Sequence, residues 1–154
     1  MQSKLLTAIS NIGKGEPIED VSKSLDWRDF EILVSHVLSE KNFSVNKNLI
    51  LTKPRMQIDV VGLKLDISLL IDCKHWKKMS DYNLRKIVSK QVERVKKYVE
   101  KTKSSIALPV IVTLYDEKVS FVNKVPIVPI TQLSSFLDDV FGNLDCMRII
   151  EKQT

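Results

Sequence analysis

The sequence predicts one α/β domain in which helices flank a central mixed β-sheet. An amphipathic helix is followed by three extended segments with short connections, and short connections join antiparallel strands. A long helix then leads into a near-continuous apolar segment, which is typical of a strand that is buried on both faces. Because a helical crossover joins parallel strands, we expect the order α-β-β-β-α-β and both kinds of strand pairing.

The first helix of this core is expected from residue 27 to residue 41. Apolar residues recur at intervals of three and four, and they form one stripe: Phe30, Leu33, Val34, Val37 and Leu38. Asp26 is the expected N-cap of this helix. Trp27, its first residue, is expected in the core.

Three strands and a long helix follow. The strands are expected at 43–51, 56–61 and 68–74. Ser80 and Asp81 offer N-terminal capping for the helix. Its inner stripe consists of Leu84, Ile87, Val88, Gln91, Val92, Val95, Tyr98 and Val99. The basic residues lie on its outer face.

The rest of the core is predicted to be a buried strand, two short strands and a last helix. The buried strand spans 106–114, and Pro109 confines its early part to a sheet edge or a strand start. Short strands are expected at 119–122 and 126–130. Thr131 is the expected cap of the final helix, which ends at Gly142.

Length and composition indicate one compact domain. A chain of 154 residues can bury about two thirds of its surface on folding. We expect a helical extension at 1–25, the core domain at 26–142 and a tail at 143–154. No apolar run is long enough to cross a membrane and no secretory signal begins the chain, so a cytoplasmic location is expected. Two cysteines without ligand spacing favour neither disulfides nor zinc.

The positive charge is concentrated in one segment. Residues 74–103 hold eleven lysine and arginine side chains against three acids, which gives +8, whereas the whole chain carries +5. Such a field suits a polyanion whose phosphates are bound by cations. The alternative is a solvated lysine-rich helix face. The expected phosphate contacts are Lys77, Lys78, Arg85, Lys86, Lys90 and Arg94.

Two acids lie within apolar strand sequences. Asp59 follows Gln57-Ile58, and Asp72-Cys73-Lys74 ends the strand at 68–74. Since strand side chains alternate, Asp72 and Lys74 share a face and Cys73 points the other way. Burying carboxylates needs compensation, and a divalent metal supplies it. Asp59, Asp72 and the backbone carbonyl of Cys73 are oxygen ligands suited to Mg²⁺, and Lys74 can orient water or a phosphate.

Two further polar side chains are expected near these acids. Glu31 lies beside the apolar stripe of its helix and points partly inward, unless its carboxylate reaches solvent. Gln91 lies within an apolar stripe, where its amide needs hydrogen-bond partners. It could brace Lys74 or a metal-held water, or it could be a core amide satisfied by backbone.

The order and spacing of these motifs resemble the PD-(D/E)xK nuclease superfamily, particularly its Mrr-type restriction endonuclease and archaeal Holliday-junction-resolvase branch. The resemblance rests on Glu31, Asp59, Asp72-Cys73-Lys74 and Gln91, and it covers residues 27–140. It implies a restriction-endonuclease-like core. Three features depart from the family pattern: Ile58 replaces the proline before Asp59, Asp72 stands where glutamate is commoner, and Gln91 matches only a variable accessory motif.

The resemblance implies a metal-dependent DNA endonuclease. Mg²⁺ or Mn²⁺ would be bound by Glu31, Asp59 and Asp72, with Lys74 at the water or scissile phosphate and Gln91 in support. A homodimer is implied because related sites often cut in pairs, and no organic cofactor is expected. The alternatives are a nucleic-acid-binding protein that does not cut, and an assembly protein in which the same charges form an ion-pair network.

Overall fold

The computed structural model describes residues 26–74, 79–114 and 118–152 of the chain. Within these ranges the order of the elements confirms the predicted α-β-β-β-α-β succession. The elements are α3 (Trp27–Glu40), β1 (Ser44–Leu51), β2 (Met56–Lys64), β3 (Ile67–Lys74), α4 (Asp81–Lys101), β4 (Ile106–Thr113), β5 (Ser120–Val122), β6 (Val125–Pro129), α5 (Ile130–Asp139), the 3-10 helix η1 (Val140–Cys146) and β7 (Ile150–Glu151). The helical extension expected at 1–25 lies outside the described residues.

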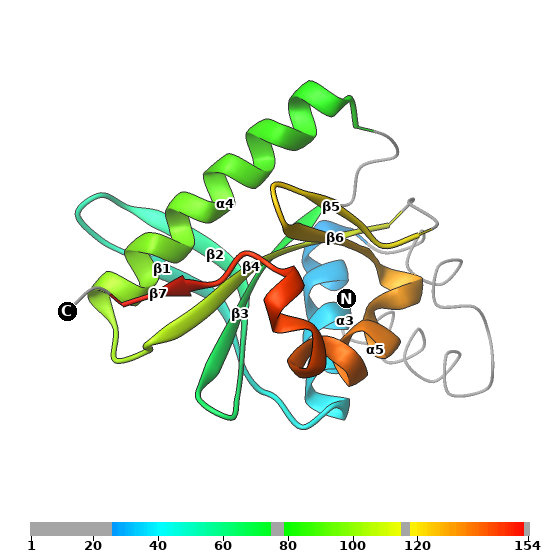
Figure 1. The fold of residues 1–154 in the computed structure, drawn as a ribbon, viewed down its shortest axis with the longest axis horizontal. Coiled ribbons are helices and arrows are strands. Elements are labelled where there is room, and N and C mark those ends of the chain that lie inside the picture. Colours follow the sequence, from blue (N-terminus) through cyan, green and yellow to red (C-terminus); the bar gives the residue numbers. More distant parts are fainter. Residues whose placement is uncertain (1–25, 75–78, 115–117, 153–154) are drawn as a thin grey trace.

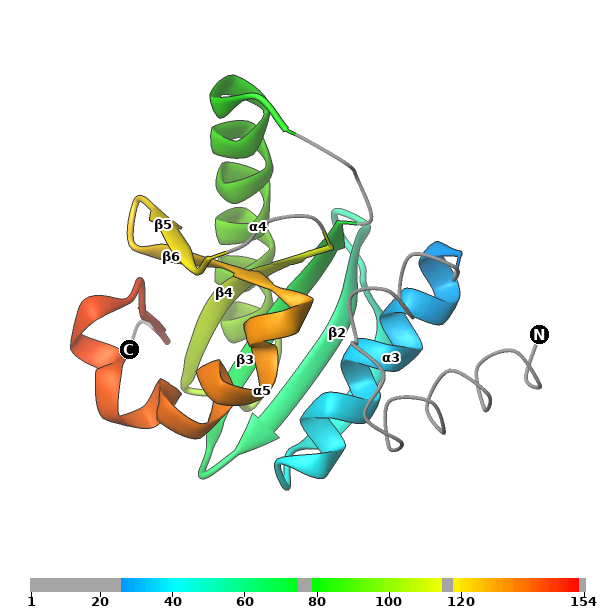
Figure 2. The same ribbon diagram turned by 90° about the vertical axis from the view of Figure 1, so that its right-hand side faces the viewer.

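The central sheet is mixed, as the sequence predicted. Its strands follow the order β1-β2-β3-β4-β6-β5, and β7 pairs with the start of β4. Strands β1, β2 and β3 are antiparallel neighbours, whereas β3, β4 and β6 run parallel. Helix α4 makes the crossover from β3 to β4. It covers one face of the sheet, and α3 and α5 cover the other (Figures 1 and 2).

Each face of the sheet has its own apolar layer. On β3, Leu69 and Ile71 pack with residues of α3 and α5, whereas Leu70 packs with α4. This is the alternation of an extended strand, and it continues to the end of β3. Cys73 accordingly packs against the layer beneath α3. Asp72 therefore faces the α4 side, and its orientation opposite to Cys73 is the one that strand alternation predicted.

Local sequence sets the beginnings of the two helices that flank the site. The Asp26 carboxylate accepts a hydrogen bond from the Asp29 N–H at 2.9 Å and caps α3. Ser80 Oγ accepts from the Asn83 N–H at 3.2 Å and caps α4. Such caps satisfy N–H groups that have no partner within the helix. None of the helices in the described ranges is long and apolar enough to cross a membrane.

The prediction that Thr131 caps the last helix is wrong. Helix α5 begins one residue earlier, at Ile130, and no side chain caps it. Strand β6 runs directly into this helix through Pro129, whose φ of −63° already suits both elements. The end of the strand therefore fixes the start of the helix, and a side-chain cap is not needed.

Pro109 lies in the middle of a central strand, contrary to the expectation of an edge or a strand start. It pairs with Leu70 of β3. On the other side of β4, β7 pairs only up to Ala107 and β6 pairs only from Ile111 onwards. The proline therefore falls in the gap between two short partners, where a missing N–H costs no ladder hydrogen bond.

The C-terminal segment adds to the sheet. Residues 143–154 were expected as a tail, and their described part contains the end of η1 and all of β7. Ile150 is 8% exposed, pairs with Ala107 and packs in the apolar layer beneath α4. This segment thereby pairs with the first two residues of β4, which β6 leaves uncovered.

Candidate functional site

The candidate site lies where β2 and β3 stop pairing. Their antiparallel register ends at Val60 with Ile71, one step before Asp59 and Asp72 would face each other. At this point Asp59 Oδ2 accepts a hydrogen bond from the Cys73 N–H at 2.9 Å. The Asp59 side chain thus replaces a backbone carbonyl as the acceptor for the Cys73 N–H. This hydrogen bond anchors the Asp59 carboxylate beside Asp72.

Asp72 is a buried carboxylate with an unsatisfied oxygen. It is 6% exposed and stays paired with Ile111 of β4. Burial raises its pKa from 3.8 to about 6, and Asp59 contributes in the same direction, whereas Lys74 and Arg94 oppose the shift. Its Oδ2 lies 3.3 Å from Lys74 Nζ, yet this ion-pair contact is not aligned as a hydrogen bond. The Asp72 carboxylate thus keeps an oxygen whose hydrogen-bonding capacity is unfilled.

Glu31 reaches the same cluster from α3. It is 4% exposed, which confirms that its side chain points inward. Burial raises its pKa from 4.5 to about 7, and Asp59 and Asp72 add to the effect. Arg28, one turn earlier on α3, opposes it. Glu31, Asp59 and Asp72 therefore interact electrostatically, as expected when carboxylates share one site.

The chemistry of this cluster fits a divalent cation. Mg²⁺ and Mn²⁺ prefer carboxylate and carbonyl oxygens. A cation would also compensate the negative charge that burial penalises at Glu31 and Asp72. In the described ranges, no three His, Cys, Asp or Glu side chains are already spaced to share an ion. Because Asp59 is bonded to the Cys73 N–H, a cation shared by all three carboxylates requires some side-chain rotation.

Lys74 and Gln91 were predicted to assist the acids, and the structure gives them different contacts. The Lys74 side chain is 22% exposed and lies beside Asp72, so the structure brings this pair together. Gln91 is 1% exposed, but its Nε2 donates to the Leu70 carbonyl at 2.8 Å. It is thus a core amide bonded to backbone, the second of the two expected arrangements. Gln91 Oε1 also accepts from Arg94 at 3.0 Å, which holds Arg94 near Asp72.

The Cys73 side chain is not part of this oxygen cluster. It packs against the apolar layer beneath α3, as predicted from strand alternation. Burial raises the pKa of its thiol well above the ordinary value, so the sulfur stays protonated at neutral pH. Only its backbone takes part, through the N–H that binds Asp59.

Four of the six predicted phosphate contacts lie along α4. Arg85, Lys86 and Lys90 are exposed, and Arg94 is half-buried. Lys77 and Lys78 lie outside the described residues. Lys90 and Arg94 border a hollow of about 420 Å³ together with Arg55 and Gln57 of the β1–β2 hairpin region. Positive charge therefore reaches the α4 side of the carboxylate cluster.

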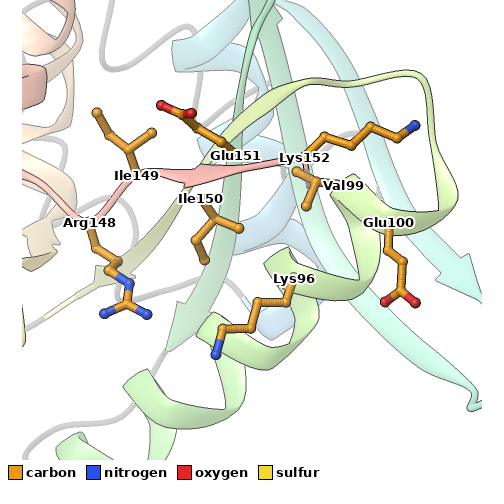
Figure 3. A pocket seen from close by; sticks show the side chains of 8 residues that line it. All are labelled: Lys96, Val99, Glu100, Arg148, Ile149, Ile150, Glu151 and Lys152. Carbon is orange, nitrogen blue, oxygen red and sulfur yellow. The ribbon is translucent and has the colours of Figure 1, made fainter. Parts of the chain in front are cut away.

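A larger cavity, about 650 Å³, lies away from the acids between α4 and the C-terminal strand (Figure 3). The side chains of Lys96 and Arg148 extend to the same side of it, and Glu151 points to the other side (Figure 3). Glu31 and Asp72, the carboxyl groups with raised pKa values, do not line this cavity. Size alone therefore does not make this cavity the better candidate for chemistry.

The sequence did not anticipate the surroundings of Glu31. Trp27, expected in the core, is 53% exposed, whereas Asp29 and Phe30 of the same first turn are buried. It borders a hollow of about 390 Å³ with Arg28, Glu31, Lys47, Asn48 and Gln57. The adjacent Trp27-Arg28 pair three residues before Glu31 was the only signal of this hollow in the sequence.

Comparison with known proteins yields no family assignment. No family model matches the chain, and no curated protein matches it. A solved structure of a protein of unknown function, AF1548, is similar over 60% of this chain and 50% of that chain, with 19% identity and a TM-score of 0.47. Protein VC1899 from Vibrio cholerae is similar over 77% of this chain and 34% of its own, with 12% identity and a TM-score of 0.46. The chain thus spans half or less of either protein.

Proposed function

We propose that this protein is a DNA endonuclease of the PD-(D/E)xK kind that requires Mg²⁺ or Mn²⁺. The observation that supports this most is the burial of Glu31 and Asp72, with raised pKa values, around the anchored carboxylate of Asp59. Perturbed acids that converge in this way are frequent at catalytic sites. Lys74, Arg94 and Arg28 are cationic neighbours of these acids, so metal binding, not the balance of charges, separates an enzyme from an ion-pair network.

The residues would divide the work of phosphodiester hydrolysis. When bound, the divalent ion supplies charge neutralisation at the phosphate and acidifies water. Glu31, Asp59 and Asp72 hold it and keep the site anionic enough to bind it. Lys74 Nζ, beside Asp72, orients the water or a non-bridging phosphate oxygen. Gln91 acts as a positioning residue, since it fixes Arg94 beside Asp72.

The basic face of α4 gives the protein its affinity for the backbone of DNA. Arg85, Lys86 and Lys90 are exposed and free of the acids in the core. Contacts of this kind are electrostatic and independent of sequence, so binding should weaken steeply as salt rises. We include Lys77 and Lys78 in this surface on their sequence alone.

The decisive test is cleavage of linear, branched and single-stranded DNA with Mg²⁺ and with Mn²⁺. The double variant Asp72→Ala/Lys74→Ala should lose at least about 100-fold in rate, because it removes a metal ligand and the adjacent cation. The matched control is Lys41→Ala/Asp138→Ala, which removes another lysine–aspartate pair, at 2.8 Å on the surface. Equal rates for the two double variants would refute the proposal.

Metal titration separates the enzyme from the two alternatives. Bound Mn²⁺ that is lost in Asp59→Ala favours the nuclease. Salt-dependent DNA affinity without metal binding favours a nucleic-acid-binding protein that does not cut. A protein with neither property favours an assembly role, in which the charges only pair with one another.

A homodimer and a cytoplasmic location are further parts of the proposal. Two subunits would allow paired cuts in the two strands of DNA. The outer strands β1 and β5 lie at opposite ends of the sheet, and either could pair with a second copy. Sedimentation of the full chain at several concentrations tests the dimer.

A further inference from the structure

An exposed tryptophan stands beside the carboxylate cluster. Trp27 is the first residue of α3 and is 53% exposed. The guanidinium carbon of Arg28 lies 5.1 Å from the centroid of its ring, so a cation covers part of the aromatic surface. A single exposed aromatic side chain is ordinary by itself, and Trp27 is of interest because it borders a hollow that Glu31 also lines.

The hollow beside Trp27 combines apolar side chains with basic and amide groups. It measures about 390 Å³, and Arg28, Lys47, Asn48 and Gln57 contribute to its walls. Gln57 Nε2 donates to Asn48 Oδ1 at 3.1 Å, and both amides keep further donors and acceptors. Asn48 has φ of +54°, a left-handed conformation that asparagine tolerates better than most residues. Asn48 lies on the edge strand β1, and Gln57 lies on its neighbour β2, two residues before Asp59.

The hollow adjoins the carboxylates and also the basic face of α4. Glu31 lines it directly. Gln57 lines both this hollow and the one bordered by Lys90 and Arg94. A strand of DNA that crosses the site would therefore meet lysines and arginines on one side of the acids and Trp27 on the other.

We propose that this hollow binds an unpaired nucleotide next to the scissile phosphate. The base would stack on Trp27, the Asn48–Gln57 amides would contact its edge, and Arg28 and Lys47 would bind the adjoining phosphate. Stacking on an aromatic ring requires an open base face, which a base inside a continuous duplex does not present. The preferred substrate is thus single-stranded DNA, or a branched or flapped DNA with unpaired bases at the cut. This inference rests on the proposed nuclease function and narrows its substrate.

The binding test uses Trp27 as its own probe. Trp76→Phe leaves Trp27 as the sole tryptophan, because the chain has two. Its fluorescence is titrated in metal-free, low-salt buffer with a single-stranded oligonucleotide and with the matching duplex. The single strand should quench it at concentrations at least about 10-fold lower than the duplex does. Equal quenching by both would overturn the proposal.

A pair of exposed aromatics supplies the control. Trp27→Ala should weaken single-strand affinity about 10-fold, measured with a labelled oligonucleotide, and leave duplex affinity unchanged. Phe121→Ala removes an aromatic of similar exposure, 49%, from β5 at the opposite end of the sheet, and it should change neither affinity. Trp27→Leu keeps an apolar side chain and should behave as Trp27→Ala does. Equal effects of Trp27→Ala and Phe121→Ala would contradict the proposed site.

Cleavage assays distinguish the two levels of the proposal. If the intact chain cuts duplex and single strand equally and Trp27→Ala changes neither rate, the nuclease stands and the nucleotide site is refuted. If single-strand binding depends on Trp27 but no DNA is cut with either metal, the nucleotide site stands and the nuclease function fails.

Discussion

Replacing Asp72 by asparagine should stabilise the metal-free protein at neutral pH and leave it nearly unchanged in acid. Burial raises the pKa of Asp72 from 3.8 to about 6. The folded state therefore binds a proton that the unfolded state has already released over this pH range. Stability from this group is present below pH 3.8 and is lost as the pH rises through 6. Asparagine does not titrate, so Asp72→Asn does not lose this stability as the pH rises.

The size of the effect follows from the two pKa values of Asp72. Each pH unit between them is worth about 1.4 kcal/mol, so the group lowers the free energy of unfolding by about 3 kcal/mol between pH 4 and pH 8. Solvent screens this effect little, because the side chain is only 6% exposed. At pH 4 the protonated carboxyl and the amide are similar in shape and charge, so the parent and Asp72→Asn should differ little.

Urea unfolding in EDTA at pH 4, 6 and 8 measures the difference directly. Asp66→Asn is the control, since Asp66 is an exposed acid at the turn of the same hairpin. The advantage of Asp72→Asn over the parent should grow by about 3 kcal/mol from pH 4 to pH 8, and that of Asp66→Asn should not. If the free energy of unfolding changed equally with pH in the parent and in Asp72→Asn, the idea that burial disfavours the ionised form of Asp72 would be refuted. Added Mg²⁺ should reduce the gap, because a bound cation favours the ionised acid.

Two other predictions test the supports of the site. Gln91→Ala should cost about 2 to 3 kcal/mol of stability, because it leaves the Leu70 carbonyl unsatisfied and removes buried packing; unfolding that matches the parent within about 0.5 kcal/mol would contradict this. Gly62→Ala should cost about 1 to 3 kcal/mol in the same urea assay, since the added Cβ would lie 3.1 Å from a Leu38 methyl and 3.3 Å from the Phe43 ring. Gly142→Ala, with nothing within 4 Å, is its control.

Local signals predicted most of the fold. Helices α3 and α4 begin at the expected caps because a cap depends on residues three positions apart, which the sequence displays directly. The roles of Pro109 and Thr131 were predicted wrongly because they depend on how distant segments pair, which local sequence does not display. The place of Pro109 depends on where β6 and β7 pair with β4, and those partners come from elsewhere in the chain.

The members of the site were predictable, but their interactions were not. Alternation along β3 placed Asp72 and Lys74 on one face, and helical spacing turned Glu31 inward. The bond from the Cys73 N–H to Asp59 could not be inferred, since it depends on β2 and β3 ceasing to pair after Val60. The exposure of Trp27 was missed because an aromatic side chain was assumed to be buried, although Trp27 lies outside the apolar stripe that begins at Phe30.

The position of Ile58 explains why the lack of a proline before Asp59 need not disable the site. Ile58 is 1% exposed, packs beneath α4 with Val61 and Leu70, and pairs with Leu49 of β1. Its large side chain fills the core at the point where β2 leaves β3, and a proline ring would fill less of that space. The carboxylate of Asp59 is instead held by the Cys73 N–H, a bond independent of the residue before Asp59, and it would rotate from this donor to share a cation with Glu31 and Asp72. Position 58 therefore stabilises the core, and the geometry of the acid is set by the neighbouring strand.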